Sequence, residues 1–427
     1  SACLVGSEMC IRDRSIAAVL FFFCAIVASA QTETAVFNPA FKSLQTKVNG
    51  NDQLPPVIVI GSDDVLEIEF DELSSERRYI RYELYHCDAL WQRDALLPSD
   101  YLDGFNEGLV DEYEMSSATL IQYIHYRIEV PNPDMHIRLS GNYLLRAYDE
   151  NDPDETLFQA RFSVVEPQLS ASASVTTRTD IDYNREHQQL SLTVDMKDLP
   201  AGSAMNDLIV TVTQNGREDN RAVAKHPTLI SGRTAVWEHC RQLIFPAGNE
   251  YHRMETVSTN YPGMHVEEIG FDDPYYIFRL VTDSPRREEP YLFDETQKGR
   301  FRIDKFDCTR PDTEAEYVMV LFTLDMPEME GADIFIDGDM FQRRFSPESL
   351  MVYNRATGRY EASALLKQGS YNYGYLAVSH GSMRGDAGLI DGNKYQTANE
   401  YLVKVYYREP GGRYDRLVAV TTALAGK

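Results

Sequence analysis

Apolar and polar residues alternate along most of this chain. The alternation is clearest in four runs: VLEIEF at 65–70, YIRYELYH at 79–86, YIHYRIEV at 123–130 and FQARFSVVE at 158–166. A period of two is typical of strands that bury one face, and clusters such as NGND, PNPD and DENDPD supply the turns between them. No long helical pattern interrupts the series. The sequence therefore predicts an all-β protein of tandem β-sandwich domains, immunoglobulin-like or early-set-like, with little helix.

Breaks in this pattern divide the chain. Pro167 follows a strand that ends in VVE, and SASASV then restarts the alternation. Farther on, Asn215-Gly216 is a hairpin signal, and Thr357-Gly358 marks a second hairpin. At about 150 residues per domain, two or three domains are expected. The pattern predicts an N-terminal sandwich at 31–166, a middle β-rich domain at 167–308 and a C-terminal sandwich at 309–427.

The first thirty residues form a leader in this interpretation. An apolar run at 15–30 follows Arg12 and Arg14 and ends in Ala-Ser-Ala, which is typical of a secretory signal peptide. We expect cleavage after Ala30 and no transmembrane segment in the mature chain. Residues 1–14, which contain MCIRDR, resemble a translated sequencing adapter more than a natural signal-peptide start.

Charge and cysteine content limit the partners and the cofactors that can be expected. The formal net charge is −25, and because phosphate binding needs a basic stripe, nucleic acid is excluded as an expected partner. Outside the leader the cysteines are Cys87, Cys240 and Cys308, at wide spacing and without a CxxC pair. One disulfide with a spare thiol and three free thiols both remain open. No cofactor is expected.

The stretch YHCDALWQRDALLPSDYLDGFNEG, at 85–108, contains many side chains that could take part in catalysis or metal binding. His86 and Cys87 are consecutive in a predicted strand, so their side chains point to opposite faces and cannot grip one metal ion together. The acidic residues that follow have no spacing that enforces a glycosidase carboxylate pair. A G-x-S-x-G elbow and an H-E-x-x-H helix are both missing from the sequence. We therefore expect no catalytic residues and no metal site, and a protein that is not an enzyme.

A binding interpretation of the same stretch is stronger. Weak alternation between 88 and 113 predicts a long loop that keeps several aromatic residues, and long loops in compact domains are often functional. Aromatic anchors in a polar rim suit a protein partner. The alternative is that these aromatics fold back and cap the open end of the sandwich. The candidate partner-binding residues are Trp91, Tyr101, Leu102, Asp103 and Phe105.

The C-terminal region suggests a second function. ADIFIDGDMFQ followed by TGRYEASALLKQGSYNYGYLAV resembles the early-set sandwich of starch- and glycogen-binding modules, which hold sugars on exposed tryptophans. The tryptophans of this chain, Trp91 and Trp237, lie outside that region. A secreted glycan-binding protein is therefore the alternative function.

Several longer segments carry a more specific resemblance. They are FNPAF at 37–41, SDYLDGFN at 99–106, SGNYLLRAYD at 140–149, DIDYN at 180–184 and FPAGNEY at 245–251. Together they resemble the Plug protein family of the type IX secretion system, in order along the mature chain. The resemblance implies a periplasmic protein that binds an outer-membrane β-barrel translocon and closes its periplasmic opening when no cargo is passing. It assigns no role to individual residues.

Overall fold

Nearly all of the regular secondary structure in the described residues is β-strand. This computed structural model describes residues 32–197, 199 and 203–426, so the predicted signal peptide lies outside the described residues. Each α-helix has four residues: α1 (Pro98–Tyr101), α2 (Ser203–Asn206) and α3 (Pro311–Glu314). The all-β prediction is confirmed. In the described part of the chain, no helix has the length and apolar character needed to cross a bilayer.

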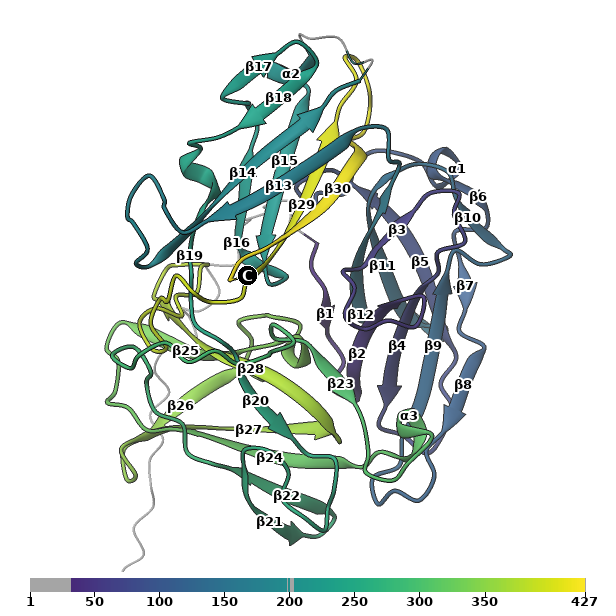
Figure 1. Cartoon of the computed structure of the whole chain (residues 1–427). Coiled ribbons are helices and arrows are strands. Elements are labelled where there is room, and N and C mark those ends of the chain that lie inside the picture. The colour runs from purple at the N-terminus through teal and green to yellow at the C-terminus, as the bar shows by residue number, and fades with distance from the viewer. Residues whose placement is uncertain (1–31, 198, 200–202, 427) are drawn as a thin grey trace, which may run out of the picture.

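The first sandwich comprises β1 to β12 and packs two sheets around one core (Figure 1), both antiparallel except where β3 pairs with β12 in parallel. One sheet has the order β1-β12-β11-β5-β7, with β3 beside β12, and the other has the order β2-β4-β9-β8. Strands β6 and β10 form a separate ribbon. The bounds are β1 (Ala35–Val36), β2 (Phe41–Val48), β3 (Val57–Val59), β4 (Leu66–Glu72), β5 (Ile80–Cys87), β6 (Leu102–Gly104), β7 (Gly108–Leu109), β8 (Glu112–Met115), β9 (Ile124–Val130), β10 (Met135–Ile137), β11 (Gly141–Asp149) and β12 (Asp152–Val165).

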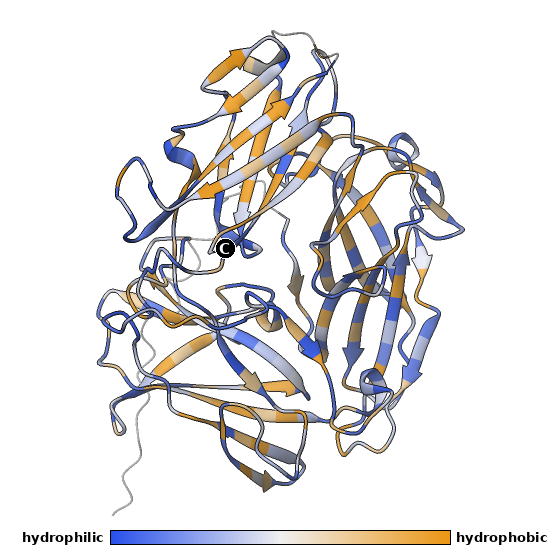
Figure 2. Cartoon of the chain, viewed as in Figure 1, coloured by the Kyte–Doolittle hydropathy of each residue, from blue (hydrophilic) through white to orange (hydrophobic). Residues whose placement is uncertain are grey.

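The apolar residues of the alternating pattern form the core of this sandwich (Figure 2). Ile68 and Phe70 of β4 point inward, and the Phe70 ring stacks on Tyr126 of β9 at 5.3 Å between ring centroids. The carboxylates that alternate with them, Glu69 and Asp71, face the other way. Every residue of β4 is nevertheless buried, because another part of the protein covers this outer face.

The middle sandwich contains strands from two distant parts of the chain. One sheet has the order β13-β14-β18-β17, with β19 beside β14, and the other has the order β16-β15-β29-β30. The Asn215-Gly216 turn joins β15 to β16 with φ of 53° and 77°, as a two-residue hairpin requires. The bounds are β13 (Ser170–Thr176), β14 (His187–Asp195), β15 (Leu208–Gln214), β16 (Arg217–Ala224), β17 (Leu229–Ser231), β18 (Thr234–Trp237), the 3₁₀ helix η1 (Arg241–Leu243), β19 (Ile244–Pro246), β29 (Glu400–Tyr407) and β30 (Arg416–Leu424).

The inserted sandwich is built between β19 and β29. Its strands join in the order β20-β28-β25-β26-β27-β24-β22-β21, with β23 beside β28. They enclose a third core, which includes Phe278, Phe322 and Tyr373. The bounds are β20 (His252–Glu255), β21 (Val266–Asp272), β22 (Tyr275–Leu280), β23 (Phe301–Ile303), β24 (Tyr317–Leu324), β25 (Ala332–Asp337), the 3₁₀ helix η2 (Asp339–Phe341), β26 (Leu350–Asn354), β27 (Arg359–Lys367) and β28 (Gly369–Ser379).

The predicted boundary between residues 308 and 309 is wrong. β20, β22 and β23 precede it, yet they pair with β28 and β24, which follow it. The last two strands belong elsewhere, because β29 pairs with β15 from Leu208↔Tyr407 to Gln214↔Tyr401. Strand alternation reports which face is buried but not which strand lies alongside, so the insertion left no local signal.

The three sandwiches occupy the corners of a triangle in Figure 1, with the first on the right, the middle one at the top and the inserted one at lower left. Each pair of sandwiches is bonded directly. The Tyr406 hydroxyl donates to Asn142 Oδ1 at 2.8 Å between the middle and first sandwiches. Lys367 Nζ lies 2.6 Å from Asp71 Oδ2 between the inserted and first sandwiches. Arg300 lies 2.6 Å from the carboxylate of Glu400, which joins the inserted sandwich to the middle one. These contacts close the triangle.

Candidate functional site

Three of the five predicted partner-binding residues are buried within the chain. Trp91 is 4% exposed, Tyr101 is 2% exposed and Leu102 is 3% exposed. Their prediction as a partner-binding surface is therefore wrong. The capping alternative describes them better, because the loop after β5 folds back onto its own sandwich.

Specific contacts hold this loop. The Tyr101 hydroxyl donates to the Leu84 carbonyl at 2.8 Å. The Trp91 ring lies beneath two cations, with the Arg161 guanidinium 4.5 Å and Lys404 Nζ 5.1 Å from the ring centroid. Since Lys404 belongs to β29, Trp91 anchors the first sandwich to the middle one, and its aromatic face is occupied from inside the protein.

Asp103 and Phe105 remain on the surface. Phe105 is 71% exposed, although its backbone N–H donates to the Asp134 carbonyl at 2.9 Å and so fixes the backbone beneath it. Leu97, on the same loop, is 65% exposed. An exposed phenylalanine on a fixed backbone can serve as an anchor for a partner without a large loss of entropy.

His86 and Cys87 have structural surroundings. The His86 ring contacts Asp94 Oδ2 through Nδ1 and the Ser140 carbonyl, 3.2 Å away, through Nε2. Burial raises the pKa of the Cys87 thiol to about 11, which keeps it protonated and unreactive at neutral pH. Cys240 and Cys308 are also free thiols in the described chain.

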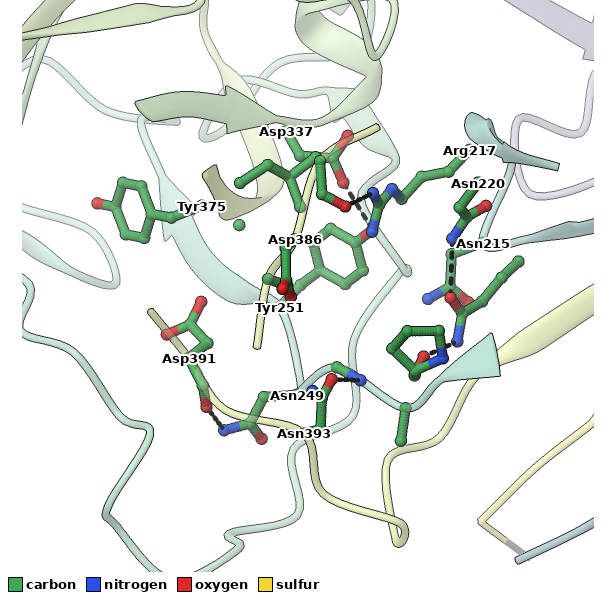
Figure 3. Close-up of a pocket in the computed structure, with 18 of the residues that line it drawn as sticks. Asn215, Arg217, Asn220, Asn249, Tyr251, Asp337, Tyr375, Asp386, Asp391 and Asn393 are labelled. Carbon is green, nitrogen blue, oxygen red and sulfur yellow. Dashed lines mark hydrogen bonds between the residues drawn. The ribbon is translucent and has the colours of Figure 1, made fainter. Parts of the chain in front are cut away.

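A pocket of about 230 Å³ lies where the chain passes between the middle and inserted sandwiches (Figure 3). Both crossing segments line it, the outgoing one near Asn249 and the returning one near Asn393. Asn249 Nδ2 donates to the Asp391 carbonyl at 2.8 Å, and the Gly248 N–H donates to Asn393 Oδ1 at 2.9 Å. These bonds tie the two crossings together, so the pocket is a fixed part of the junction.

The far wall of the pocket comes from β16. Arg217 donates to the Gly385 carbonyl at 2.9 Å and to Asp219 at 2.6 Å. Asn220 is 6% exposed and donates to Gln214 Oε1 at 2.9 Å, while its own Oδ1 has no partner among the described residues. Most polar groups in this pocket are thus already bonded to the protein.

A buried ionic network supports one side of the pocket. His252 Nδ1 lies 3.0 Å from Asp283 Oδ1, and its Nε2 lies 3.3 Å from Asp391 Oδ1. Burial opposes the charge on His252, but the two carboxylates outweigh it and raise its pKa to about 9. Burial likewise tends to raise the pKa of Asp391, but His252 and Arg286 lower it overall. A general acid of a glycosidase needs a raised pKa, and Asp391 has the opposite property.

The aromatic residues that suggested sugar binding lie inside the protein. Trp91 and Trp237 are both buried, at 4% and 0% exposed. Tyr371, Tyr373 and Tyr375, from the repeated tyrosines of β28, are buried too. The hydroxyls of Tyr373 and Tyr375 each donate to Asp283 Oδ2 at 2.7 Å. None of these five rings can serve as a stacking platform for a glycan.

No pattern in the sequence indicated the pocket. Its walls come from segments near residues 214–220, 246–251, 374–376 and 382–399, which are far apart along the chain. The Asn215-Gly216 turn was its one recognisable element, and a hairpin signal does not indicate what packs against it.

Comparison with known proteins identifies the family. A family model described as "Type 9 secretion system plug protein 1st domain" matches residues 41–166, which form most of the first sandwich. The chain belongs to the type IX secretion system plug family. Among curated proteins, nothing matches the chain.

A solved structure is similar over nearly the whole protein. It is a hypothetical protein from Parabacteroides merdae, 44% identical, with a TM-score of 0.91, and the match covers 92% of this chain and 99% of that one. A second match is an alkylpurine DNA glycosylase from Pseudomonas fluorescens, bound to DNA containing an abasic site analog. It is 13% identical, the match covers 31% of this chain and 30% of that one, and the TM-score is 0.16. So low a TM-score carries no argument. The plug family associates this protein with the type IX secretion machinery.

Proposed function

We propose that this protein is a non-enzymatic periplasmic plug, which binds the outer-membrane translocon of the type IX secretion system and closes its periplasmic opening when no cargo is in transit. The observation that carries the proposal is the family match over residues 41–166. Export into the periplasm by the predicted signal peptide, with cleavage after Ala30, is part of the same proposal.

The closed triangle supports this role. A plug must block an opening as one body, and three sandwiches bonded in pairs resist bending better than sandwiches joined end to end. The ion pair between the inserted and first sandwiches is shielded from water, because Lys367 and Asp71 each have 1% of their side chain exposed. Buried charge pairs are costly to separate, because each partner would be left unpaired.

The proposed contact surface is the exposed part of the 97–105 loop on the first sandwich. Phe105 and Leu97 supply apolar area, and Asp103 supplies negative charge beside it. A protein of net charge −25 approaches a basic rim faster at low salt than at high salt, since ions screen the attraction. Reversible binding would then combine fast, salt-sensitive association with a small apolar anchor.

The first test is affinity purification of the tagged mature protein from detergent-solubilised envelopes, followed by identification of the recovered partner by mass. Recovery of a large outer-membrane β-barrel is expected. Recovery of the protein alone, together with measurable binding to α-glucans, would overturn the proposal in favour of the glycan-binding alternative.

The contact surface is tested with a matched pair of variants. Phe105→Ser should greatly reduce recovery of the translocon. Phe293→Ser, on the inserted sandwich at a residue that is 62% exposed, should leave recovery unchanged. Both changes are at the surface, so thermal stability should shift little in either variant. Loss of recovery with Phe293→Ser alone would assign the contact to the inserted sandwich.

A further inference from the structure

Three potential metal ligands meet where the inserted sandwich covers the first. Glu69 comes from β4, His125 from β9 and Asp312 from α3. One ligand atom from each lies within 4.8 Å of those from the other two. Ligand atoms in a tetrahedral zinc site are about 3.4 Å apart, so small side-chain rotations would close the three around a cation.

Strand register brings the first two ligands together. β4 and β9 pair antiparallel, with Asp71 opposite His125 and Glu69 opposite Arg127. Residues two apart in a strand point to the same face, so Glu69 lies diagonally beside His125 on the outer face of this sheet. That face is covered, because the inserted sandwich packs against it.

The third ligand is placed by α3. Lys367 Nζ donates to the Asp312 carbonyl at 2.6 Å, and the Ser117 N–H donates to the Thr313 carbonyl at 2.9 Å. The first bond fixes α3 to its own sandwich and the second fixes it to the first sandwich. The Asp312 carboxylate is therefore held at the seam.

The His125 ring is oriented as metal-binding histidines usually are. Its Nδ1 lies 2.8 Å from Asp71 Oδ1. A carboxylate at this nitrogen favours the tautomer with hydrogen on Nδ1, which leaves the Nε2 lone pair free for a cation. Asp71 is anchored in turn, since it accepts a hydrogen bond from the Tyr317 hydroxyl at 2.6 Å.

The charges around the three ligands favour a bound cation. Lys47 Nζ lies 2.5 Å from Glu69 Oε2 and occupies one oxygen of that carboxylate, so the other oxygen is available. Three carboxylates, those of Glu69, Asp71 and Asp312, face two ammonium groups, those of Lys47 and Lys367. The cluster thus carries an excess of negative charge when His125 is neutral.

We propose that Glu69, His125 and Asp312 bind one divalent transition-metal cation that bridges the first and inserted sandwiches. One imidazole nitrogen and two carboxylate oxygens suit Zn²⁺, with water completing the coordination. Hard cations such as Mg²⁺ favour oxygen ligands throughout and should bind more weakly. The site does not depend on the plug function, and its role is to join two bodies of the protein.

The test uses the full mature chain after treatment with a chelator. Calorimetric titration with Zn²⁺ should show one equivalent bound and a rise in Tm. Asp312→Asn and His125→Asn should each weaken zinc binding at least 10-fold. Lys47→Met should tighten it, because it removes the ammonium that competes for Glu69. Replacement of zinc by Co²⁺ should give a tetrahedral absorption spectrum that His125→Asn abolishes.

The control is His187→Asn. His187 also lies near a carboxylate, with Nδ1 2.7 Å from Asp182 Oδ2, so the variant removes a comparable His–Asp pair outside the cluster. Zinc affinity should be unchanged. The proposal is overturned if the wild type binds no zinc, or if all the variants bind zinc equally. Asp312 is only partly buried, so Asp312→Asn decides the question even if His125→Asn fails to fold.

Discussion

The charge on His252 is predicted to stabilise the inserted sandwich in a pH-dependent way. The ring lies between Asp283 and Asp391, at 3.0 Å and 3.3 Å, and only 8% of its side chain is exposed. The perturbation is His252→Asn, which removes the titrating group. Asp283 keeps the hydroxyls of Tyr373 and Tyr375 as donors, so it retains neutral partners in the variant.

The magnitude follows from the pKa. The folded protein holds this proton with a pKa of about 9, against an ordinary histidine pKa of 6.5. A difference of this size corresponds to about 3 kcal/mol. Because the folded pKa is the higher one, this stabilisation is fully present below about pH 6.5 and is lost as the pH rises through about 9.

The assay is urea denaturation followed by circular dichroism, at pH 6 and at pH 9.5. The free energy of unfolding of the wild type should fall between these pH values by about 3 kcal/mol more than that of His252→Asn. The difference between the two proteins isolates His252, since every other titrating group is common to both. His187→Asn, outside the network, should behave like the wild type. If wild type and His252→Asn show the same pH dependence, the argument that the two carboxylates hold a proton on His252 is refuted.

Three further predictions concern the interfaces. Burial lowers the pKa of Lys404 to about 8, so its charge opposes folding below that pH. Lys404→Met should therefore raise the free energy of unfolding at pH 7 by about 1–3 kcal/mol, and this gain should shrink as the pH rises from about 8 to 10.5. A urea titration at each pH measures the gain. Trp91→Ala should lower the free energy of unfolding by about 3–5 kcal/mol, whereas Phe105→Ser should change it by less than about 0.5 kcal/mol; similar losses in both variants would contradict their assigned burial. Lys367→Met should cost about 3–5 kcal/mol because it leaves Asp71 without its ammonium, and a double variant with Asp71→Asn should lose less than the sum of the single changes, which a double-mutant cycle in urea detects.

Local patterns predicted the strands well, because a strand with one buried face must alternate whatever lies beyond it. VLEIEF became β4, YIHYRIEV became β9, and the turns at Asn215-Gly216 and Thr357-Gly358 close hairpins. The all-β class follows from these elements alone. Turn chemistry is equally local, since an Asn-Gly pair adopts positive φ at little cost.

The candidate site was predicted less well, and Trp91 shows why. Its aromatic character and loop position suited a partner-binding anchor, but two cations cover its ring, and one of them, Lys404, is more than 300 residues away along the chain. Exposure depends on what packs above a residue. The sequence of the loop contains no information about β29.

The sequence by itself determined that this chain forms strands, where most of them turn, and which family it resembles. Only the tertiary structure decided that β29 and β30 complete the middle sandwich, and that one sandwich is inserted into another. It also brought His125 and Glu69 next to Asp312, although no metal site was predicted from the sequence. The physical reason is that alternation and turns depend on neighbours along the chain, whereas strand partners and interfaces depend on contacts between residues hundreds of positions apart.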